Sequence, residues 1–206
     1  MYGHRARIGY CSPPFVTETF CYEFYKMVPD GVTLMITTLE IRTRTKEEVV
    51  GCHERSLEAA QYMADSGAHV VVLGGNPVNQ SLGVENLPKL CEDLGNKIGT
   101  KVVTSTQAQI EAMTLLGSKK VASVHCYEPE HNDRHEQSVR NMGFEPTGII
   151  AVGSDFKHIG AIDVDVAFKL ASQVKEENPE ADTIHLGSAH WAVAHVLDKI
   201  EKELGV

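Results

Sequence analysis

The sequence has no long hydrophobic run and no closely spaced pair of cysteines. None of its segments approaches the roughly 18 consecutive apolar residues that a membrane-spanning helix requires. Its five cysteines are odd in number and scattered, so they predict neither a disulfide framework nor a zinc site. The first residues include Arg5 and Arg7 but lack the apolar stretch and the cleavage site of a signal peptide. These absences favour a cytoplasmic protein in a reducing compartment.

Positive charge is also scarce. Across 206 residues, 19 Lys and Arg stand against 28 Asp and Glu, which leaves a formal net charge of −9. Such a surface repels phosphate backbones and anionic lipids, so we expect no nucleic acid and no membrane as a partner. Hydrophobic residues at 42% and charged residues at 23% are typical of a globular chain with one domain or two small lobes.

Short β-rich runs alternate with segments of helical periodicity along the whole chain. Leu57, Ala60 and Ala64, for example, form a helical stripe that ends before Gly67. This alternation predicts an α/β fold with parallel sheets. The expected strands cover residues 7–10, 33–41, 69–73, 101–104, 120–125, 148–152 and 183–186.

Two stretches of the sequence resemble each other at a constant offset of 113 residues, because 67–75 (GAHVVVLGG) aligns with 180–188 (EADTIHLGS). The same offset places Pro14 on Tyr127 and Gly75 on Ser188. We therefore expect two copies of one α/β unit. They would form Rossmann-like lobes, related by a pseudo-twofold axis, that face a central cleft.

The predicted lobes cover residues 1–107 and 108–206. In the first half, a helix around residues 87–98 is followed by the expected strand at 101–104. The second half reaches Gly205 and Val206 where its matching strand should begin. We therefore expect that a C-terminal strand is missing from this chain.

Ligands of open α/β sheets bind beyond the carboxyl ends of the strands. The candidate site therefore consists of the turns at residues 11–14, 74–77, 125–127 and 187–190.

In the first half, Gly75 and Asn76 could offer backbone N–H groups and a side-chain amide to a carboxylate. The alternative is a tight turn that only requires glycine. Cys11 supplies a thiol after the first strand, or else is a small buried hydrophobic residue. Neither the G-x-G-x-x-G pattern nor a Walker lysine is present, so we expect no nucleotide site.

In the second half, Ser188, Ala189 and His190 bring together a hydroxyl, backbone donors and an imidazole where a helix is expected to begin. The alternative is an ordinary N-cap serine followed by a first-turn histidine. A helix N-terminus would lower the pKa of His190. Tyr127 could direct its phenol at a developing oxyanion, or could simply cover the core.

His131 and His135 are spaced at i and i+4, as metal ligands on a helix can be. The acidic residues around them indicate a solvated helix face instead. We therefore expect no metal site.

The turns and their strands resemble the aspartate/glutamate racemase superfamily, most closely its arylmalonate decarboxylase and maleate isomerase branch. The resemblance covers nearly the whole chain. It implies two α/β lobes around a cleft without a cofactor, in which a small carboxylic acid becomes enediolate-like and is reprotonated. The stretches that carry it are 8–14 (IGYCSPP), 67–76 (GAHVVVLGGN), 119–127 (KKVASVHCY), 143–148 (GFEPTG) and 181–188 (ADTIHLGS).

The chain departs from this superfamily at the catalytic thiols. Two-base racemases carry a cysteine at the end of the third strand of each half, and decarboxylases of the branch keep the second one. This chain has Gly75 and Ser188 there. A serine hydroxyl is far less acidic than a thiol of pKa about 8.5, so it needs a strong helper for proton transfer at neutral pH. Asn76, Tyr127 and His190 do match positions of superfamily motifs.

These observations favour a cofactor-independent isomerase, decarboxylase or related lyase that acts on a small carboxylic or dicarboxylic acid. The alternative is a non-catalytic carboxylate-binding or sensing relative that has lost its thiols. A homo-oligomer is compatible with either. The catalytic candidates are His190, Ser188 and Cys11, and the binding candidates are Pro14, Gly75, Asn76, Tyr127 and Ala189.

Overall fold

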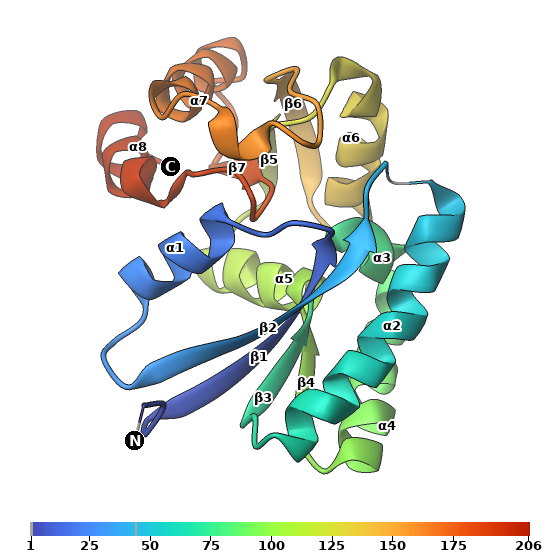
Figure 1. Ribbon diagram of the computed structural model, residues 1–206. Helices are drawn as coiled ribbons and strands as arrows, with labels where there is room; N and C mark the ends of the chain where they lie inside the picture. Colours follow the sequence, from blue (N-terminus) through green and yellow to red (C-terminus); the bar gives the residue numbers. More distant parts are fainter. Residues whose placement is uncertain (1, 44) are drawn as a thin grey trace. The chain divides into compact units, whose positions relative to one another are not determined.

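The computed structural model describes residues 2–43 and 45–206 (Figure 1). The chain forms two compact units. The first runs to Thr17 and resumes over Phe24–Ala112, and the second consists of Glu18–Glu23 and Met113–Val206. Helix α1 (Thr19–Met27) thus belongs to both units. The lobe boundary predicted between residues 107 and 108 and the missing C-terminal strand stay predictions.

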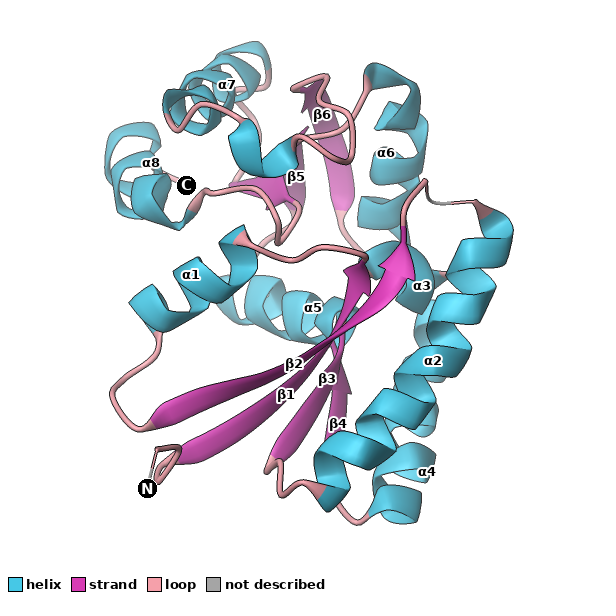
Figure 2. Cartoon of the chain, in the orientation of Figure 1, coloured by secondary structure: helices cyan, strands magenta, loops and turns pink. Residues whose placement is uncertain are grey.

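The first unit is built on a four-stranded parallel sheet in the order β2-β1-β3-β4. Helices α2 and α4 pack against the same face of this sheet (Figure 2). Helix α2 begins at a capping box in which Thr45 and Glu48 each bind the other's backbone N–H. The elements are β1 (Ala6–Pro14), β2 (Val32–Ile41), α2 (Lys46–Asp65), β3 (Val70–Leu73), α3 (Asn76–Gln80), α4 (Leu87–Ile98), β4 (Lys101–Thr104) and α5 (Ser105–Leu116). The last four residues of α5, from Met113 on, belong to the second unit.

The second unit has a three-stranded parallel sheet in the order β6-β5-β7. Its elements are β5 (Lys120–His125), α6 (Asn132–Asn141), β6 (Glu145–Ala151), α7 (Asp165–Glu177), β7 (Thr183–Gly187) and α8 (Leu197–Leu204). Short 3-10 turns cover Val84–Asn86 in the first unit and Pro129–His131, Ile159–Ala161 and Ala194–Val196 in the second.

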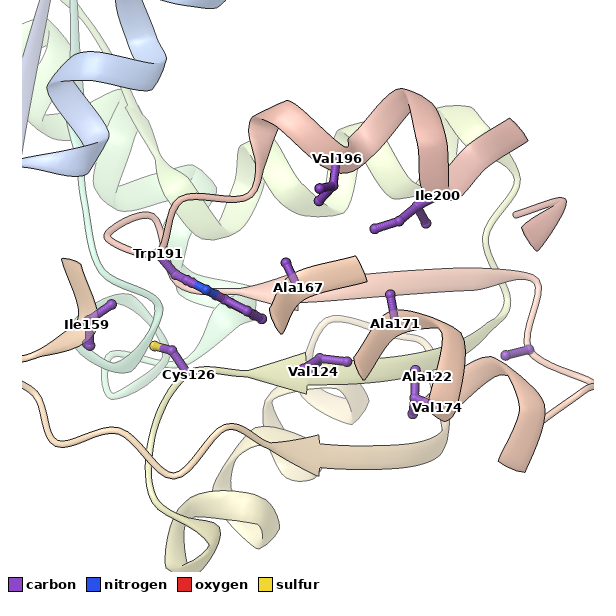
Figure 3. Close-up of a cluster of buried hydrophobic side chains, with 11 residues drawn as sticks. Ala122, Val124, Cys126, Ile159, Ala167, Ala171, Val174, Trp191, Val196 and Ile200 are labelled. Carbon is purple, nitrogen blue, oxygen red and sulfur yellow. The ribbon is translucent and has the colours of Figure 1, made fainter. Parts of the chain in front are cut away.

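One face of the second sheet carries the apolar core of its unit. Ala122 and Val124 of β5 point toward α7 and α8, where Ala171 and Ile200 are buried with them (Figure 3). Trp191 belongs to the same core and is 1% exposed. Truncating a buried tryptophan to alanine costs about 3–5 kcal/mol. Trp191 therefore holds the loop between β7 and α8 firmly against the core.

Strand register reproduces the offset found in the sequence. In the first unit Ile8 pairs with Val70, and in the second Val121 pairs with Thr183, 113 positions later in each case. The match continues along the strands to Cys11 with Leu73 and Val124 with Leu186. All seven expected strands are present, and the predicted α/β class with parallel sheets in two groups is confirmed.

Two local expectations are wrong. The segment at residues 11–14 is not a turn, since β1 continues to Pro14 and pairs with β2 as far as Ile41. A register shift between Ser12 and Pro14 accommodates the prolines, which have no N–H to donate. Nor does a helix begin at Ser188. An irregular loop follows β7, and α8 begins at Leu197.

Among the described residues, no helix is both long enough and apolar enough to cross a membrane.

Candidate functional site

Ser188 lies directly after β7 and accepts two hydrogen bonds. The Tyr127 Oη donates to its Oγ at 3.3 Å, and the His190 backbone N–H donates to the same atom at 3.2 Å. A hydroxyl can accept two bonds and still donate its own proton. The second unit therefore brings together the three predicted residues Tyr127, Ser188 and His190, with the Ser188 hydroxyl at their centre.

Backbone strain accompanies this arrangement. Ser188 has a φ of 133°, in a region that side chains with a Cβ rarely adopt. Such strain costs of order 1–3 kcal/mol and collects at functional sites. Ala189 is exposed in the turn that follows, while Trp191 is buried beyond it. The chain thus holds the strained serine between a strand end and a core anchor.

The Tyr127 ring is fixed by four neighbouring rings. His135 stacks on it at a centroid distance of 5.5 Å, and Phe156 stacks at 6.3 Å. His131 meets it edge-on at 6.2 Å, and His125 lies at 6.0 Å. Ring contacts of this kind restrict how an aromatic side chain can turn. They direct the phenol toward Ser188.

The two histidines expected on a helix face therefore pack around Tyr127. His135 also stacks on His125, with centroids 4.1 Å apart. Within residues 2–43 and 45–206, no group of three or more His, Cys, Asp or Glu side chains is placed to hold a metal ion.

His190 is a partly enclosed imidazole. Its Nδ1 is buried and has no hydrogen-bond partner among the described residues. Burial lowers the pKa of His190 from its ordinary value to about 4. The direction agrees with our expectation, but the cause is different, because His190 is not in the first turn of a helix. At neutral pH the side chain is uncharged.

His185 on β7 is a second histidine of this kind. Burial, and to a lesser degree electrostatic repulsion from His125, lowers the pKa of His185 to about 4. In the unfolded chain, both His185 and His190 would titrate near their ordinary pKa of about 6.5.

We expect acid to destabilise the protein between pH 6.5 and 4. In this window the unfolded chain binds protons at His185 and His190 that the folded chain excludes, because their pKa values are about 4 when folded. The stability present above pH 6.5 is then lost as the pH falls, by up to roughly 1.4 kcal/mol per pH unit for each histidine. Urea denaturation at pH 7, 6 and 5 measures this slope. His190→Asn should have a shallower slope, and an equal slope in both proteins would contradict the assignment.

In the first unit, the glycines after β3 are sterically required. A Cβ on Gly74 would lie 2.5 Å from the Cys11 carbonyl oxygen. Gly75 has a φ of 89°, and a Cβ there would overlap the Pro13 ring. The structural alternative for this turn, that it simply requires glycine, thus explains both residues.

Asn76, the first residue of α3, is bound to α5. Its Nδ2 donates to Gln109 Oε1 at 2.6 Å, and its Oδ1 accepts from Thr106 at 3.0 Å and Ser105 at 3.4 Å. An Asn amide has two N–H donors, so one remains beyond the bond to Gln109. The side chain is therefore rigidly placed, and most of its hydrogen-bonding capacity is used within the unit.

Cys11 lies in the core of the first unit and is 0% exposed. Its thiol contacts the Ser56 carbonyl oxygen at 3.7 Å. Burial, and then the neighbouring Cys52, raises the pKa of Cys11 to about 12. At pH 7 the thiol is protonated and shielded. Pro14, at the end of the same strand, is buried and paired with Ile41.

Two cavities lie away from these residues. One of about 580 Å³ in the first unit runs along α4 and the edge strand β4, between Cys91, Gly95 and Lys101. Another of about 90 Å³ in the second unit lies between Ser123, Glu136 and Thr147. Neither is lined by a predicted site residue.

Sequence reasoning did not find Phe20 and Glu23, which belong to the second unit beside the His190 loop. The Phe20 and His190 rings lie 6.5 Å apart, and Glu23 Oε1 accepts the Ala194 N–H at 2.8 Å. These residues precede their contacts by about 170 positions, and no local pattern signals such a pairing. Phe156, which stacks on Tyr127, was missed for the same reason.

Comparison with known proteins gives consistent matches. The family model for arylmalonate decarboxylase matches residues 8–206. The arylmalonate decarboxylase of Bordetella bronchiseptica is 22% identical over 182 residues, which cover 88% of this chain and 75% of that protein.

Solved structures share the fold. A double mutant of arylmalonate decarboxylase in its liganded form, with one glycine changed to cysteine and one cysteine to serine, has a TM-score of 0.86 at 22% identity. It is matched over 98% of this chain and 85% of that one. The maleate isomerase Iso from Pseudomonas putida S16 has a TM-score of 0.80 at 20% identity, over 97% and 85% of the two chains. A cysteine-to-serine mutant of Nocardia farcinica maleate cis-trans isomerase, with a covalently bound succinylcysteine intermediate, has a TM-score of 0.83 at 16% identity, over 98% and 85%.

Proposed function

Because the chain belongs to the arylmalonate decarboxylase family, whose model matches residues 8–206, we propose that it converts a small carboxylic or dicarboxylic acid through an enediolate-like species. The expected branch is confirmed by this match. The matched relatives are named as a decarboxylase and as maleate isomerases. The proposed reaction is accordingly a decarboxylation or an isomerisation that depends on proton transfer at carbon.

The observation that carries the proposal is the hydrogen-bonded group Tyr127–Ser188–His190. The Tyr127 phenol and the Ser188 hydroxyl are donors held within 3.3 Å of each other. A substrate carboxylate that replaces this mutual bond would accept from both. Donors fixed in advance stabilise the negative charge of an enediolate more than that of a delocalised ground-state carboxylate, and this difference accelerates the reaction. The exposed Ala189 adds a backbone N–H in the same turn.

His190 is the proposed proton carrier. With a pKa of about 4 it is neutral in the free protein, and so weakly basic that it needs help. A bound carboxylate supplies that help, because a nearby negative charge favours the imidazolium and raises the histidine pKa. In a decarboxylation, the C–C bond breaks, its electron pair moves into the remaining carboxylate, and CO₂ leaves. The imidazolium then gives its proton to the α-carbon and returns to neutral.

Ser188 is proposed as a hydrogen-bond donor and not as the base. The pKa of an aliphatic hydroxyl lies far above that of a thiol, so the serine stays protonated at neutral pH. Cys11 has no part in the proposed step, since its thiol is buried and its pKa is about 12.

Pro14, Gly75 and Asn76 of the first unit remain proposed carboxylate-binding residues. Asn76→Ala tests carboxylate binding by the first unit separately from the second unit, and Asn86→Ala is its control. Asn86 is exposed, and its side-chain amide donates to the Leu82 carbonyl oxygen at 2.9 Å. A weakened apparent affinity for substrate in Asn76→Ala alone supports this assignment.

The function is tested by incubating the protein with aryl- and alkylmalonates, maleate and amino acids in D₂O. Proton NMR then follows CO₂ loss, cis–trans conversion and deuterium incorporation at the α-carbon. We expect at least one of these changes, and we expect it to be lost in Tyr127→Phe. Saturable binding without any of the three would contradict the proposed enzyme and favour the non-catalytic carboxylate-binding alternative.

A further inference from the structure

Helix α1 contributes its first residues to the second unit. Of its residues, Thr19 to Glu23 belong there and the remainder belong to the first unit. Glu18, just before the helix, lies against the 3-10 turn Ile159–Ala161, since a Cβ on Gly160 would be 3.1 Å from Glu18 Oε2. The beginning of α1 is therefore attached to the second unit at more than one point.

Two residues of α1 contact the loop that carries His190. Phe20 and Glu23 are three positions apart, so they lie on one face of the helix. The Phe20 ring is 6.5 Å from the His190 ring, with an angle of 48° between their planes. Glu23 Oε1 accepts the Ala194 N–H at 2.8 Å, four residues after His190. The same helix face thus meets both the imidazole and the backbone that follows it.

We propose that Phe20 is a positioning residue for His190, whose ring keeps water from one side of the imidazole while Glu23 fixes the loop. The inference deepens the proposed function, because it assigns a control element to the proton carrier. His190 Nδ1 is buried and has no hydrogen-bond partner among the described residues. Its surroundings therefore exclude water, and no protein group supplies a hydrogen bond in place of water. An apolar ring beside the imidazole favours its neutral form.

Charged and titratable groups around His190 do not account for its neutral state. The carboxylates at the beginning of α1 are Glu18 and Glu23, and a carboxylate close to the imidazole would raise its pKa. The Tyr127 phenol donates a hydrogen bond to the Ser188 hydroxyl, which also accepts one from the backbone N–H of His190. The lowered pKa of His190 has burial as its cause. Removing the apolar cover should therefore move the pKa upward.

The test is an NMR titration of the His190 ring in the full-length protein, with His190→Asn used to assign the signal. Phe20→Ala should raise the pKa from about 4 by at least roughly one unit toward the ordinary value of about 6.5. Phe20→Leu, which keeps an apolar cover, should restore the low pKa. Tyr22→Ala is the matched control, because Tyr22 is an aromatic residue of the same helix but is 66% exposed.

A second variant keeps the test decisive. No residue of α1 is buried, so Phe20→Ala should fold. Phe20→Gln, which keeps the length of a large side chain but brings a polar group, should give the same upward shift. A His190 pKa unchanged within about 0.3 units in folded Phe20→Ala and Phe20→Gln would overturn the proposal.

This readout is independent of turnover. If the pKa rises in Phe20→Ala although the wild-type protein turns over no substrate, the role of Phe20 is supported and the proposed function fails. If turnover is found and the pKa does not move, the function is supported and the inference about Phe20 is overturned.

Discussion

Replacing His190 by asparagine is expected to lower turnover by ~10²-fold or more, which is the usual contribution of a positioned acid or base. Asparagine cannot carry a proton near neutral pH, but it is similar in size to the imidazole. The His190 Nδ1 has no hydrogen-bond partner among the described residues, so the substitution breaks no side-chain bond there. The fold and carboxylate binding should be retained. Single-turnover rates on the best substrate, with binding measured by calorimetry, separate the two effects.

His195→Asn is the matched control for this experiment. His195 lies in the same loop region, is exposed, and contacts the Val164 carbonyl oxygen at 3.1 Å. Its substitution should leave turnover within about twofold. Cys11→Ala should also retain turnover, since that thiol is buried and protonated. Unchanged turnover in His190→Asn together with loss in Cys11→Ala would assign the proton transfer to Cys11.

The pH dependence of substrate binding follows from the lowered pKa of His190. In the free protein His190 is neutral above about pH 4, so a carboxylate that binds beside it should draw in a proton. Binding of the carboxylate then weakens as the pH rises through the raised pKa of the complex. The reason is that the imidazole must take its proton from a solution with fewer free protons.

The sequence predicts the sheets well because parallel strands leave a clear pattern. Strands such as Val70–Leu73 are short, continuous apolar runs between helical segments. The 113-residue offset was visible for a related reason, since paired strands of both units keep the same register. Equivalent positions must meet equivalent neighbours, which preserves the spacing even where side chains differ.

Loop structure next to the site was harder to predict, because tertiary packing overrides local signals there. Serine is a preferred N-cap residue, yet no helix begins at Ser188, because Trp191 three residues later is buried in the core. Likewise, β1 continues through two prolines because β2 supplies partners as far as Ile41. Phe20 reaches the His190 ring through the fold alone, so no spacing in the sequence indicates it.

Gly75 and Ser188, which the resemblance places at the two cysteine positions of the racemase superfamily, differ in whether they can accept a thiol. Gly75 has a φ of 89°, and any Cβ there would overlap Pro13, so Gly75→Cys should destabilise the first unit. Ser188 already holds a Cβ at its strained φ of 133°. Exchanging its oxygen for sulfur therefore adds little further strain, and only this position can accept the thiol.

Ser188→Cys is accordingly expected to raise turnover by ~10²-fold on substrates that decarboxylate or isomerise through an enediolate. The new thiol, with an ordinary pKa of about 8.5, can give and take a proton near neutral pH where the hydroxyl cannot. The Tyr127 Oη, which donates to the Ser188 oxygen at 3.3 Å, would stabilise the thiolate and lower its pKa. Ser188→Ala is the control, because it lacks any acidic group at this position. The pH dependence of iodoacetamide labelling gives the thiol pKa, and CO₂ release or maleate conversion gives the rate. A folded Ser188→Cys variant that is labelled readily but is no faster than Ser188→Ala would show that a group at position 188 does not transfer a proton to the substrate.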